Sequence, residues 1–383
     1  MTRSGSSLRL PPLSLYVHVP WCVRKCPYCD FNSHAQQGDL PEQAYLQALL
    51  EDLDSELPLV QGRELVSIFI GGGTPSLMSA AFYQQLLPAI EQRIPFSKSI
   101  EITLEANPGT FEQARFAGFR YAGINRLSLG VQSFTDSSLQ ALGRIHSGQD
   151  AFTAIQKAQA LGFEQINLDL MHGLPGQTPA MALADLQQGL SLGTSHLSWY
   201  QLTIEPNTEF HSRPPKLPAD EQLWAIQDQG QALLARAGFE QYEISAYSRA
   251  GQQCRHNLNY WRFGDYLGIG AGAHGKLTNL HQHQLLRHSK LRQPKAYLAS
   301  PGKCQSRVVA EDELGLEFMM NVLRLNQGVE TELFAAATGA PLATIQPILD
   351  QGRNLGLLET DSARLAPTLQ GRRFLNDLLE LFV

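Results

Sequence analysis

Three cysteines, Cys22, Cys26 and Cys29, lie within one stretch of eight residues. Thiolates are natural ligands of iron–sulfur clusters, and a cluster of four irons held by three cysteines keeps one iron without a protein ligand. That open iron can bind a substrate or a cofactor. The spacing therefore predicts a [4Fe-4S] cluster with one exchangeable coordination position.

Zinc and a disulfide are the alternative explanations of these thiols. A structural zinc site needs four protein ligands, so His18 or His34 would have to complete it, and the second CxxC pair of most zinc loops is absent from the sequence. A disulfide framework is disfavoured because the five cysteines are an odd number and residues 1–10 lack the apolar segment of a signal peptide.

Further residues of chemical interest follow short apolar runs that predict β-strands. These runs alternate with helical patterns, among them 41–57 and 219–237, which is typical of βα units and a parallel sheet. Parallel strands bring their carboxyl ends to one face of a barrel, where active sites are assembled. Strands are predicted over 13–19, 65–70, 99–104, 126–129, 165–170 and 196–202, and at or just after their ends come the cysteine loop, Gly71–Gly73, Glu105, Gln132, Asp169 and Thr203. One more strand is predicted over 242–245.

The motif CxxxCxxC followed by an aromatic residue resembles that of the radical S-adenosylmethionine (SAM) enzymes. In that family the open iron chelates the amino and carboxylate groups of SAM, and a glycine motif like Gly71–Gly73 binds the methionine amino group. An ordinary tight turn explains the same glycines equally well. The resemblance implies an α/β fold with a partial parallel (β/α)6 barrel, a cluster on Cys22, Cys26 and Cys29, and SAM as a cofactor.

Within the superfamily, the chain is similar to the branch of the oxygen-independent coproporphyrinogen III oxidases. In that branch a carboxylate can bind the ribose hydroxyls of SAM, and an arginine can pair with a carboxylate. Taken singly, each polar residue is equally well an ordinary loop or surface residue. The resemblance implies SAM-binding positions at Tyr16, Tyr28, Gly72, Gly73, Thr74, Glu105, Gln132, Arg144, Asp169 and Thr203.

Two features favour the HemW family of haem chaperones over the oxidases themselves. The oxidases carry a fourth cysteine two residues after the third, where this chain has Phe31. The run from His256 to Trp261 fits HNxxYW, which together with CxxxCxxCxF resembles the HemW proteins. The resemblance implies a chaperone that binds haem, a [4Fe-4S] cluster and SAM and inserts haem into apo-haemoprotein recipients, membrane respiratory enzymes among them. It also implies a homodimer that depends on the cluster.

His256 is the predicted haem-binding residue. A neutral imidazole is a standard axial ligand of haem iron, and Tyr260 and Trp261 offer flat apolar surfaces for a porphyrin. An ordinary His-Asn turn with two core aromatic residues explains the same run. The main alternative function is radical SAM decarboxylation of coproporphyrinogen III; a radical SAM enzyme for an unrelated substrate is the second.

The composition sets wider limits on the class of protein. The 383 residues can form a large core and a smaller second domain, and 43% hydrophobic with 17% charged residues is typical of a soluble globular protein. The formal net charge of −6 argues against a nucleic-acid partner. Since no apolar run is long enough to cross a bilayer, we expect a cytoplasmic protein.

After residue 250 the sequence no longer shows the alternation of apolar runs and helical patterns. We expect a loop-rich segment over 254–275, in which the glycines between Gly268 and His274 form a ligand contact or a packed bend. A basic stretch follows over 281–295, where His281, His283 and His288 and the cations of 287–295 fit an exposed loop, a metal site or a partner for haem propionates. Helical patterns over 312–325, 330–337, 342–352 and 368–381, with extended runs at 355–358 and 363–365, predict a mostly helical, winged-helix-like domain. The predicted organisation is a barrel over 1–250, a loop-rich extension over 251–305 and the helical domain over 306–383.

Overall fold

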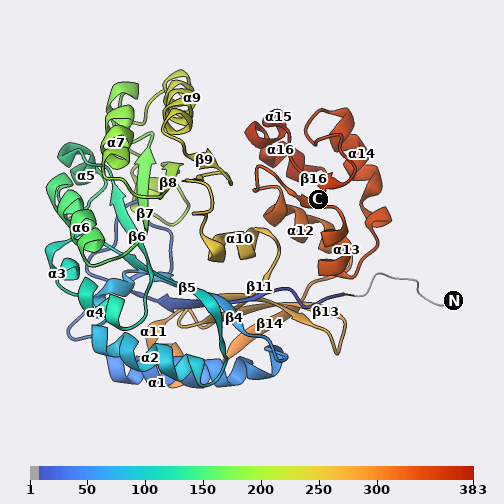
Figure 1. Ribbon diagram of the computed structural model, residues 1–383, viewed down its shortest axis with the longest axis horizontal. Helices are drawn as coiled ribbons and strands as arrows, with labels where there is room; N and C mark the ends of the chain where they lie inside the picture. Colours follow the sequence, from blue (N-terminus) through green and yellow to red (C-terminus); the bar gives the residue numbers. More distant parts are fainter. Residues whose placement is uncertain (1–7) are drawn as a thin grey trace.

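The computed structural model describes residues 8–383; residues 1–7 of the predicted barrel region, and with them most of the Met1 to Leu10 segment, lie outside the described residues. An α/β part and a smaller, mostly helical C-terminal part lie side by side, with α10 (Arg255–Trp261) between them (Figure 1). Among the described residues, no helix is both long and apolar enough to cross a membrane.

Six parallel strands form the centre of the α/β part. Each pairs with the next one in the sequence, so the strands follow one another across the sheet in chain order. They are β1 (Leu13–Val19), β4 (Leu65–Gly72), β5 (Phe96–Ala106), β6 (Arg126–Gln132), β7 (Gln165–His172) and β8 (His196–Gln201). This arrangement confirms the predicted partial barrel and the six strands on which the prediction depends.

Helices connect these strands and cover the outer face of the sheet (Figure 1). Their starts follow local signals; for example, Ser147 and Asp150 form a capping box at the start of α6, which satisfies backbone N–H groups that the helix itself cannot. Each fully buried leucine or isoleucine between helices and sheet contributes roughly 1.5–3 kcal/mol to folding. The helices are α1 (Glu42–Glu56), α2 (Ala80–Glu91), α3 (Thr110–Gln113), α4 (Phe116–Tyr121), α5 (Asp136–Ala141), α6 (Gly148–Ala160), α7 (Pro179–Ser191), α8 (Glu209–Ser212) and α9 (Asp220–Arg236), with short 3-10 turns η1 (Leu57–Leu59) and η2 (Pro75–Leu77).

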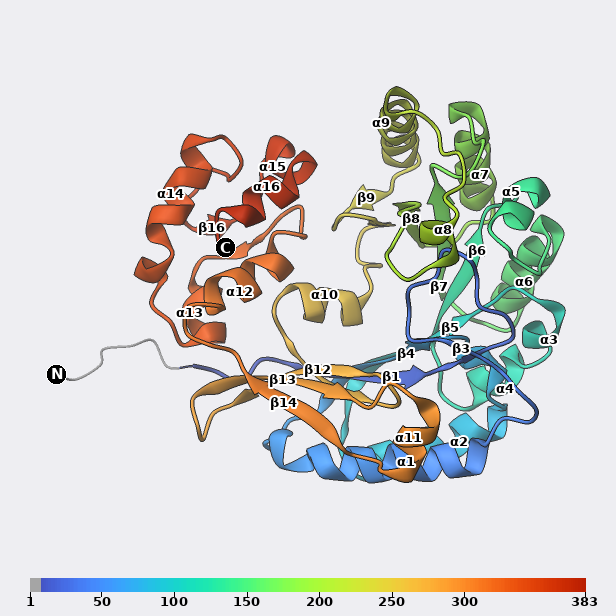
Figure 2. The same ribbon diagram turned by 180° about the vertical axis from the view of Figure 1, so that it is seen from behind.

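The sheet continues past β1 with four strands that the sequence analysis did not predict. β11 (Asp265–Ile269) runs parallel to β1, and β12 (His274–Asn279), β13 (Gln284–Lys290) and β14 (Cys304–Val308) follow antiparallel (Figure 2). The helix α11 (Pro294–Ala299) connects the last two. The prediction of a loop-rich segment over 254–275 is therefore wrong. Of the stretch 281–295, only residues 281–283 form an exposed turn, and β13 and α11 occupy most of the rest.

A physical reason for this error lies in the burial of β11. All five of its residues are buried, so the strand lacks the alternation that marks a half-exposed strand. Gly268 also interrupts the apolar run, and it is required there because a Cβ would lie 2.0 Å from the carbonyl oxygen of His274. A glycine in a buried strand marks such a close approach of two backbones.

The other edge of the sheet also corrects a prediction. β10 (Ala246–Ser248) pairs antiparallel with β8 and with β9 (Glu240–Gln241), so the strand predicted over 242–245 is wrong and these residues form a turn. Tyr242 is buried because its hydroxyl lies 2.8 Å from His196 Nε2, and not because it belongs to a strand. Within residues 8–383, the sheet ends at β9 on one side and at β14 on the other, so the barrel is open.

The C-terminal part has a hydrophobic core of its own, centred on Phe318, Phe334 and Leu349, to which Leu8, Phe263 and Leu285 also contribute. Its helices are α12 (Leu314–Val322), α13 (Glu332–Thr338), the 3-10 turn η3 (Leu342–Thr344), α14 (Gln346–Asn354), α15 (Leu369–Arg373) and α16 (Leu375–Glu380). The single predicted helix over 368–381 is thus divided at Phe374. The short strand β16 (Arg364–Leu365) pairs with β15 (Val329–Glu330), and the run 355–358 contributes one bridge, from Leu358 to Pro367. The domain limits 1–250, 251–305 and 306–383 stay a prediction.

Candidate cofactor-binding site

The cysteine loop leaves the carboxyl end of β1, as predicted. Two short parallel strands, β2 (Trp21–Cys22) and β3 (His34–Ala35), close the loop at its base, and the backbone N–H of Cys29 donates a hydrogen bond to the Cys26 carbonyl at 3.1 Å. The three thiols are free, and all line one cavity of about 300 Å³. Burial and then the neighbouring Cys29 and Cys26 raise the pKa of Cys22. Three converging thiols suit a cluster, because bound iron replaces the thiol protons.

The histidines that would complete a zinc site have other partners. His18 Nδ1 lies 3.0 Å from the Tyr16 hydroxyl and His18 Nε2 lies 2.9 Å from the Asn32 carbonyl oxygen. His34 Nε2 lies 3.3 Å from Asn32 Oδ1. Since both ring nitrogens of His18 are engaged, this histidine supports the loop and does not offer a fourth metal ligand.

The predicted SAM-binding positions gather at the same cavity. Besides the cysteines, its wall contains eight of the ten predicted residues: Tyr28, Gly72, Gly73, Thr74, Glu105, Gln132, Arg144 and Asp169. These residues come from the cysteine loop, from the ends of β4, β5, β6 and β7 and from the loop after α5. The cavity therefore lies at the carboxyl ends of the parallel strands, where the sequence placed it.

The glycine turn is a tight turn that also lines the cavity, and its binding of the methionine amino group stays a prediction. Gly72 has φ +120°, and a Cβ on Gly73 would lie 2.5 Å from the Trp21 carbonyl oxygen, so the turn needs glycine for its own geometry. The backbone N–H groups of Gly73 and Thr74 donate to the carbonyls of Val19 and Trp21 at 2.8 and 2.7 Å. The turn is therefore bonded to the base of the cysteine loop and brings bare backbone to the cavity wall.

Two predicted SAM positions lie elsewhere. Tyr16 lines a neighbouring cavity, and Thr203 is exposed beyond the end of β8, outside the walls of both cavities. Tyr200 takes the place on the wall that was predicted for Thr203. The sequence analysis missed two residues of the cavity wall, Asn107 and Tyr200. Asn107 lies two positions after Glu105. Tyr200 lies two positions after Ser198, whose hydroxyl donates a hydrogen bond to the Asn167 side chain beside Asp169. The period of two in a strand was the signal that could have found both.

Two buried carboxyl groups give the cavity an acidic side. Burial, and then the neighbouring Asp169, raise the pKa of Glu105 to about 8, although the Gly72 N–H donates to Glu105 Oε2 at 3.1 Å. Burial also raises the pKa of Asp169, against hydrogen bonds from Asn167 and Ser128 at 2.8 and 3.0 Å. Such groups are suited to accept hydrogen bonds from hydroxyl groups or to ionise beside an ammonium group.

Arg144 is one of three cationic residues that line the cavity, with Arg24 and Lys25. Its Nη1 lies 3.7 Å from Cys26 Sγ, and its Nη2 donates to Asn107 Oδ1 at 2.6 Å and to the Gly130 carbonyl at 2.8 Å. Next to it, Gln132 has φ +67°, a strained conformation for a non-glycine residue, and its Oε1 accepts a hydrogen bond from the Tyr200 hydroxyl at 2.9 Å. A guanidinium beside a cluster ligand stabilises negative charge there.

The second cavity adjoins the first and has a volume of about 450 Å³. The two cavities share Phe31, Gly72 and Glu105. Its wall is Tyr16, His18, Phe31, Asn32, Gly72, Glu105, His256, Tyr260, Tyr266, Gly272, His274 and Arg292. The predicted haem residue His256 thus lies in a cavity next to the cluster and SAM site, although the sequence analysis did not connect the two.

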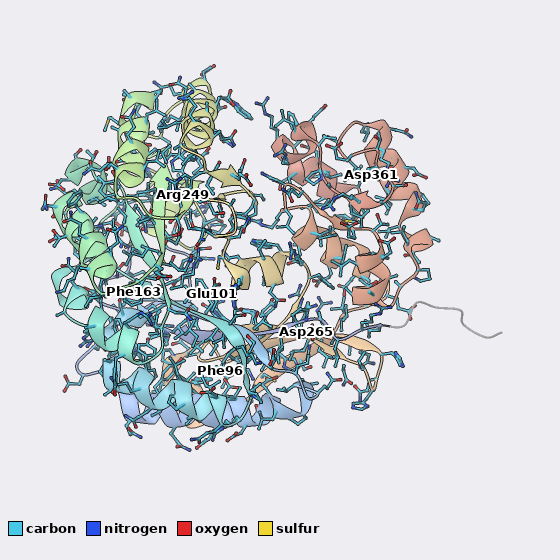
Figure 3. The ribbon with its side chains drawn as sticks, viewed as in Figure 1. Phe96, Glu101, Phe163, Arg249, Asp265 and Asp361 are labelled. Carbon is cyan, nitrogen blue, oxygen red and sulfur yellow. The ribbon has the colours of Figure 1, made fainter. Side chains whose placement is uncertain are left out.

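His256 is held firmly on α10. Its backbone N–H donates to Glu101 Oε1 at 3.1 Å, and its Nδ1 lies 3.1 Å from Ser67 Oγ (Figure 3 labels Glu101 beside α10). Burial lowers the pKa of His256 to about 3, so the imidazole is neutral near pH 7. A neutral imidazole is the form that coordinates iron.

The aromatic surface differs from the one predicted. Tyr260 lines the second cavity, but Trp261 does not; Tyr266 accompanies Tyr260 instead, with ring centroids 4.9 Å apart. The Arg324 guanidinium lies over the Trp261 ring at 4.4 Å, so Trp261 packs against the C-terminal part. The spacing of HNxxYW correctly placed one of its two aromatic residues beside His256.

The downstream histidines and cations are not one exposed cluster. His281 and His283 are exposed in a turn, whereas His288 is buried in β13. Arg287 pairs with Glu317, and Lys290 pairs with Asp52 and Glu56. Only Arg292 from this basic stretch lines the second cavity. The glycines before His274 do form a packed bend, in which a Cβ on Gly272 would lie 2.2 Å from Asn32 Nδ2, and Gly272 and His274 also face the cavity.

Comparisons with known proteins agree with this architecture. Residues 16–188 match the Radical SAM superfamily and residues 309–374 match the HemN C-terminal domain. In the solved structures, the coproporphyrinogen III oxidase (HemN) from Escherichia coli, described as a radical SAM enzyme, superimposes with a TM-score of 0.81 over 97% of this chain and 90% of that chain. Its sequence identity is 23%, so this likeness concerns the fold.

Full-length relatives identify the family. The heme chaperone HemW of Escherichia coli (strain K12) is 52% identical over 98% of this chain and 99% of that protein, and that of Haemophilus influenzae is 52% identical over the same shares. The heme chaperone HemW of Bacillus subtilis (strain 168) is 34% identical over 97% of this chain and 99% of that protein. Membership of the radical SAM superfamily implies a [4Fe-4S] cluster and SAM. The chain, as the cysteine loop and the HNxxYW motif predicted, belongs to the HemW family.

Proposed function

We propose that the protein is a haem chaperone that binds haem, a [4Fe-4S] cluster and SAM, and that it inserts haem into apo-haemoproteins. The observation that carries the proposal is the pair of adjoining cavities, one lined by the three thiols and the other by a neutral histidine and two tyrosines. The relatives with the highest identity quoted above bear the name heme chaperone.

In the first cavity, Cys22, Cys26 and Cys29 would hold three irons of the cluster and leave the fourth for SAM. When bound, the cluster supplies an electron that can cleave SAM. Glu105 and Asp169 offer oxygens for the ribose hydroxyls, and Arg144 offers a partner for the carboxylate. Gly72 and Gly73 leave room for the methionine amino group, while Tyr16 and Thr203 stay predicted SAM positions that the cavity does not support.

In the second cavity, His256 would coordinate haem iron through Nε2. This requires the proton to lie on Nδ1, where it would be donated to Ser67 Oγ, 3.1 Å away. Tyr260 and Tyr266 would flank the porphyrin, and Arg292 would pair with a propionate. The recipients would be apo-haemoproteins, membrane respiratory enzymes among them, in the cytoplasm, with a homodimer that depends on the cluster.

Haem titration tests this proposal. We expect the wild type to show a Soret shift at one equivalent of haem and His256→Ala to bind haem at least tenfold more weakly. His274→Ala is the matched control, because His274 lines the same cavity on another element and is expected to keep the spectrum. Haem transfer to an apo-recipient must fall with haem affinity in the same series. Equal spectra and affinities in the wild type and His256→Ala would refute the assigned ligand.

The alternative function, decarboxylation of coproporphyrinogen III, is favoured by one observation, the likeness of the fold to an oxidase structure. Against it stands Phe31, which is 60% exposed where the oxidases have a fourth cysteine. Cluster-reconstituted protein, incubated anaerobically with coproporphyrinogen III and SAM, should yield no protoporphyrinogen. Product formation would replace the chaperone proposal with an enzyme.

A further inference from the structure

A second group of metal-ligating side chains lies on the outer face of the sheet, away from both cavities. Glu56 at the end of α1, His288 on β13 and Cys304 on β14 each offer one ligand atom, and these atoms all lie within 4.8 Å of one another. None of the three lines either of the two cavities of the candidate site. In Figure 2, α1 lies beneath β14 and α11, and the group is formed where these elements meet.

The fold brings these residues together by simple periodicities. His288 and Lys290 are two positions apart on β13, so they share one face of the sheet, and Cys304 is the partner of Lys290 across the ladder to β14. Asp52 and Glu56 are four positions apart on α1, so they share one face of the helix. Helix and sheet thus present two carboxylates, an imidazole, an ammonium group and a thiol to one small volume.

The distances suit a small tetrahedral ion. His288 Nδ1 lies 3.1 Å from Glu56 Oε2. Ligands at the usual zinc distances of about 2.0–2.1 Å stand roughly 3.3 Å apart around a tetrahedral ion, so little movement would admit one. A thiol, an imidazole and a carboxylate are a borderline-soft set that selects zinc-like ions over Mg²⁺ or Ca²⁺.

The charges of the group also favour a cation. Asp52 and Glu56 are buried with one positive partner, the Lys290 ammonium, which lies 2.7 Å from Asp52 Oδ1 and also contacts Glu56 Oε1. His288 Nδ1 lies 3.1 Å from Glu56 Oε2 and 3.2 Å from Glu56 Oε1, so an ion between the imidazole and Oε2 would replace their hydrogen bond. A divalent ion with a Cys304 thiolate adds one net positive charge and would bring the two carboxylates, the ammonium and the thiolate to neutrality. Cys304 is partly exposed, which gives an ion a route from solvent.

We propose that Glu56, His288 and Cys304 bind a thiophilic divalent cation of the Zn²⁺ class, with water in the fourth position. The site is independent of the cluster and of haem. A bound ion would tie the end of α1 to β13 and β14 and so stabilise the strands that extend the barrel sheet.

Cobalt is the probe for this site, because a thiolate ligand to tetrahedral Co²⁺ gives charge-transfer and visible d–d absorption. The experiment uses cluster-reconstituted protein under anaerobic conditions, so that Cys22, Cys26 and Cys29 are occupied by iron. We expect one equivalent of Co²⁺ to bind with both bands and Zn²⁺ to displace it. Cys304→Ser should lose the charge-transfer band, and His288→Gln should bind at least tenfold more weakly.

His281→Gln is the matched control, since His281 is an exposed histidine in the turn that precedes the same strand. Thermal unfolding without metal shows whether each variant is folded, and Zn²⁺ should raise the midpoint of the wild type and of His281→Gln only. The proposal is overturned if the wild type binds no equivalent of Co²⁺, or if Cys304→Ser and His288→Gln bind it as tightly as the wild type does. Neither result would affect the haem titration, so the two proposals stand or fall separately.

Discussion

The two adjoining cavities are built in different ways. The wall of the first comes from the cysteine loop and the ends of successive parallel strands, with Arg144 added from the loop after α5. The wall of the second joins β1, the cysteine loop and the ends of β4 and β5 to a later part of the chain, namely α10, β11, the bend before β12 and Arg292. Tyr16 and His256, which both line it, are 240 positions apart. A site at strand ends is a consequence of the barrel, whereas a site between distant segments depends on packing that no local pattern encodes.

The largest effect should separate the two cavities completely. Cys26→Ser removes one of three cluster ligands, and we expect total loss of the cluster absorbance and of bound iron after reconstitution. Haem affinity should stay within about twofold of the wild type, because His256 and its supports contain no cysteine. Cys304→Ser controls for loss of a thiol as such. If haem binding disappears together with the cluster, the cavities are one cooperative site and the comparison fails.

A second prediction tests the rigidity of the first cavity. Gly73→Ala places a Cβ 2.5 Å from the Trp21 carbonyl oxygen, a clash with backbone that cannot rotate away. We expect the free energy of unfolding to fall by about 3 kcal/mol, measured by urea denaturation, with impaired cluster assembly.

Gly176→Ala is the control for this substitution. Gly176 has φ +70° and no atom within 4 Å of a Cβ, so alanine there should cost about 1 kcal/mol and leave the cluster intact. Equal losses at the two positions would show that the turn around Gly73 yields easily, and that its contact with the cysteine loop is not a constraint.

The pH dependence of stability should come from the first cavity. Burial and Asp169 raise the pKa of Glu105 from 4.5 to about 8. Because the folded state then binds a proton that the unfolded state has released, stability is lost as pH rises from the unfolded pKa through about 8. In SAM-free protein between pH 6 and 8.5, we expect a loss of about 2 kcal/mol that Glu105→Gln lacks.

Parallel slopes for the wild type and Glu105→Gln over this range would show that Glu105 titrates normally. His256 contributes no such slope, since burial lowers its pKa to about 3 and the residue stays neutral throughout. The two buried groups therefore differ in whether a change of pH near neutrality alters their charge.

The difference between the two cavities also explains which features of the structure could be predicted from the sequence. The six parallel strands and the cysteine loop were predictable, because each depends on a run of neighbouring residues. The ten SAM positions came from the family resemblance, and eight of them line the first cavity. Thr203 stays a predicted SAM position; it lies two residues beyond the end of β8 and outside the cavity wall, which Tyr200 lines. Strand ends are where local patterns are weakest.

The segment from residue 251 to residue 308 was largely missed for a different reason, whereas the helical patterns that follow it were predicted. β11 is buried on both sides and interrupted by Gly268, so no alternation marks it. Lys290, part of an apparently exposed basic stretch, is buried because Asp52 and Glu56 neutralise it from 234 to 238 positions away. The motif singled out His256 and Tyr260, but not Tyr266 or Ser67, which also lie beside His256 or line its cavity.

The smallest predicted effect concerns the support of His256. Ser67 Oγ lies 3.1 Å from His256 Nδ1 and 2.7 Å from Ser14 Oγ, which accepts a hydrogen bond from Asn259 Nδ2 at 2.9 Å. If Nε2 coordinates iron, Nδ1–H needs the Ser67 acceptor, so Ser67→Ala should weaken haem binding by about 1 kcal/mol, a factor of about five.

Ser14→Ala is the graded control, because it leaves Ser67 in contact with the imidazole and removes only the next member of the chain. Haem titration should therefore rank the wild type, Ser14→Ala, Ser67→Ala and His256→Ala in order of falling affinity. An unchanged affinity in Ser67→Ala alongside a loss in His256→Ala would mean that the imidazole is held by α10 alone, through the hydrogen bond from its backbone to Glu101. The position of His256 in the second cavity would then depend on α10, the helix between the barrel and the C-terminal part. The residues of the first cavity depend in the same way on the ends of the parallel strands.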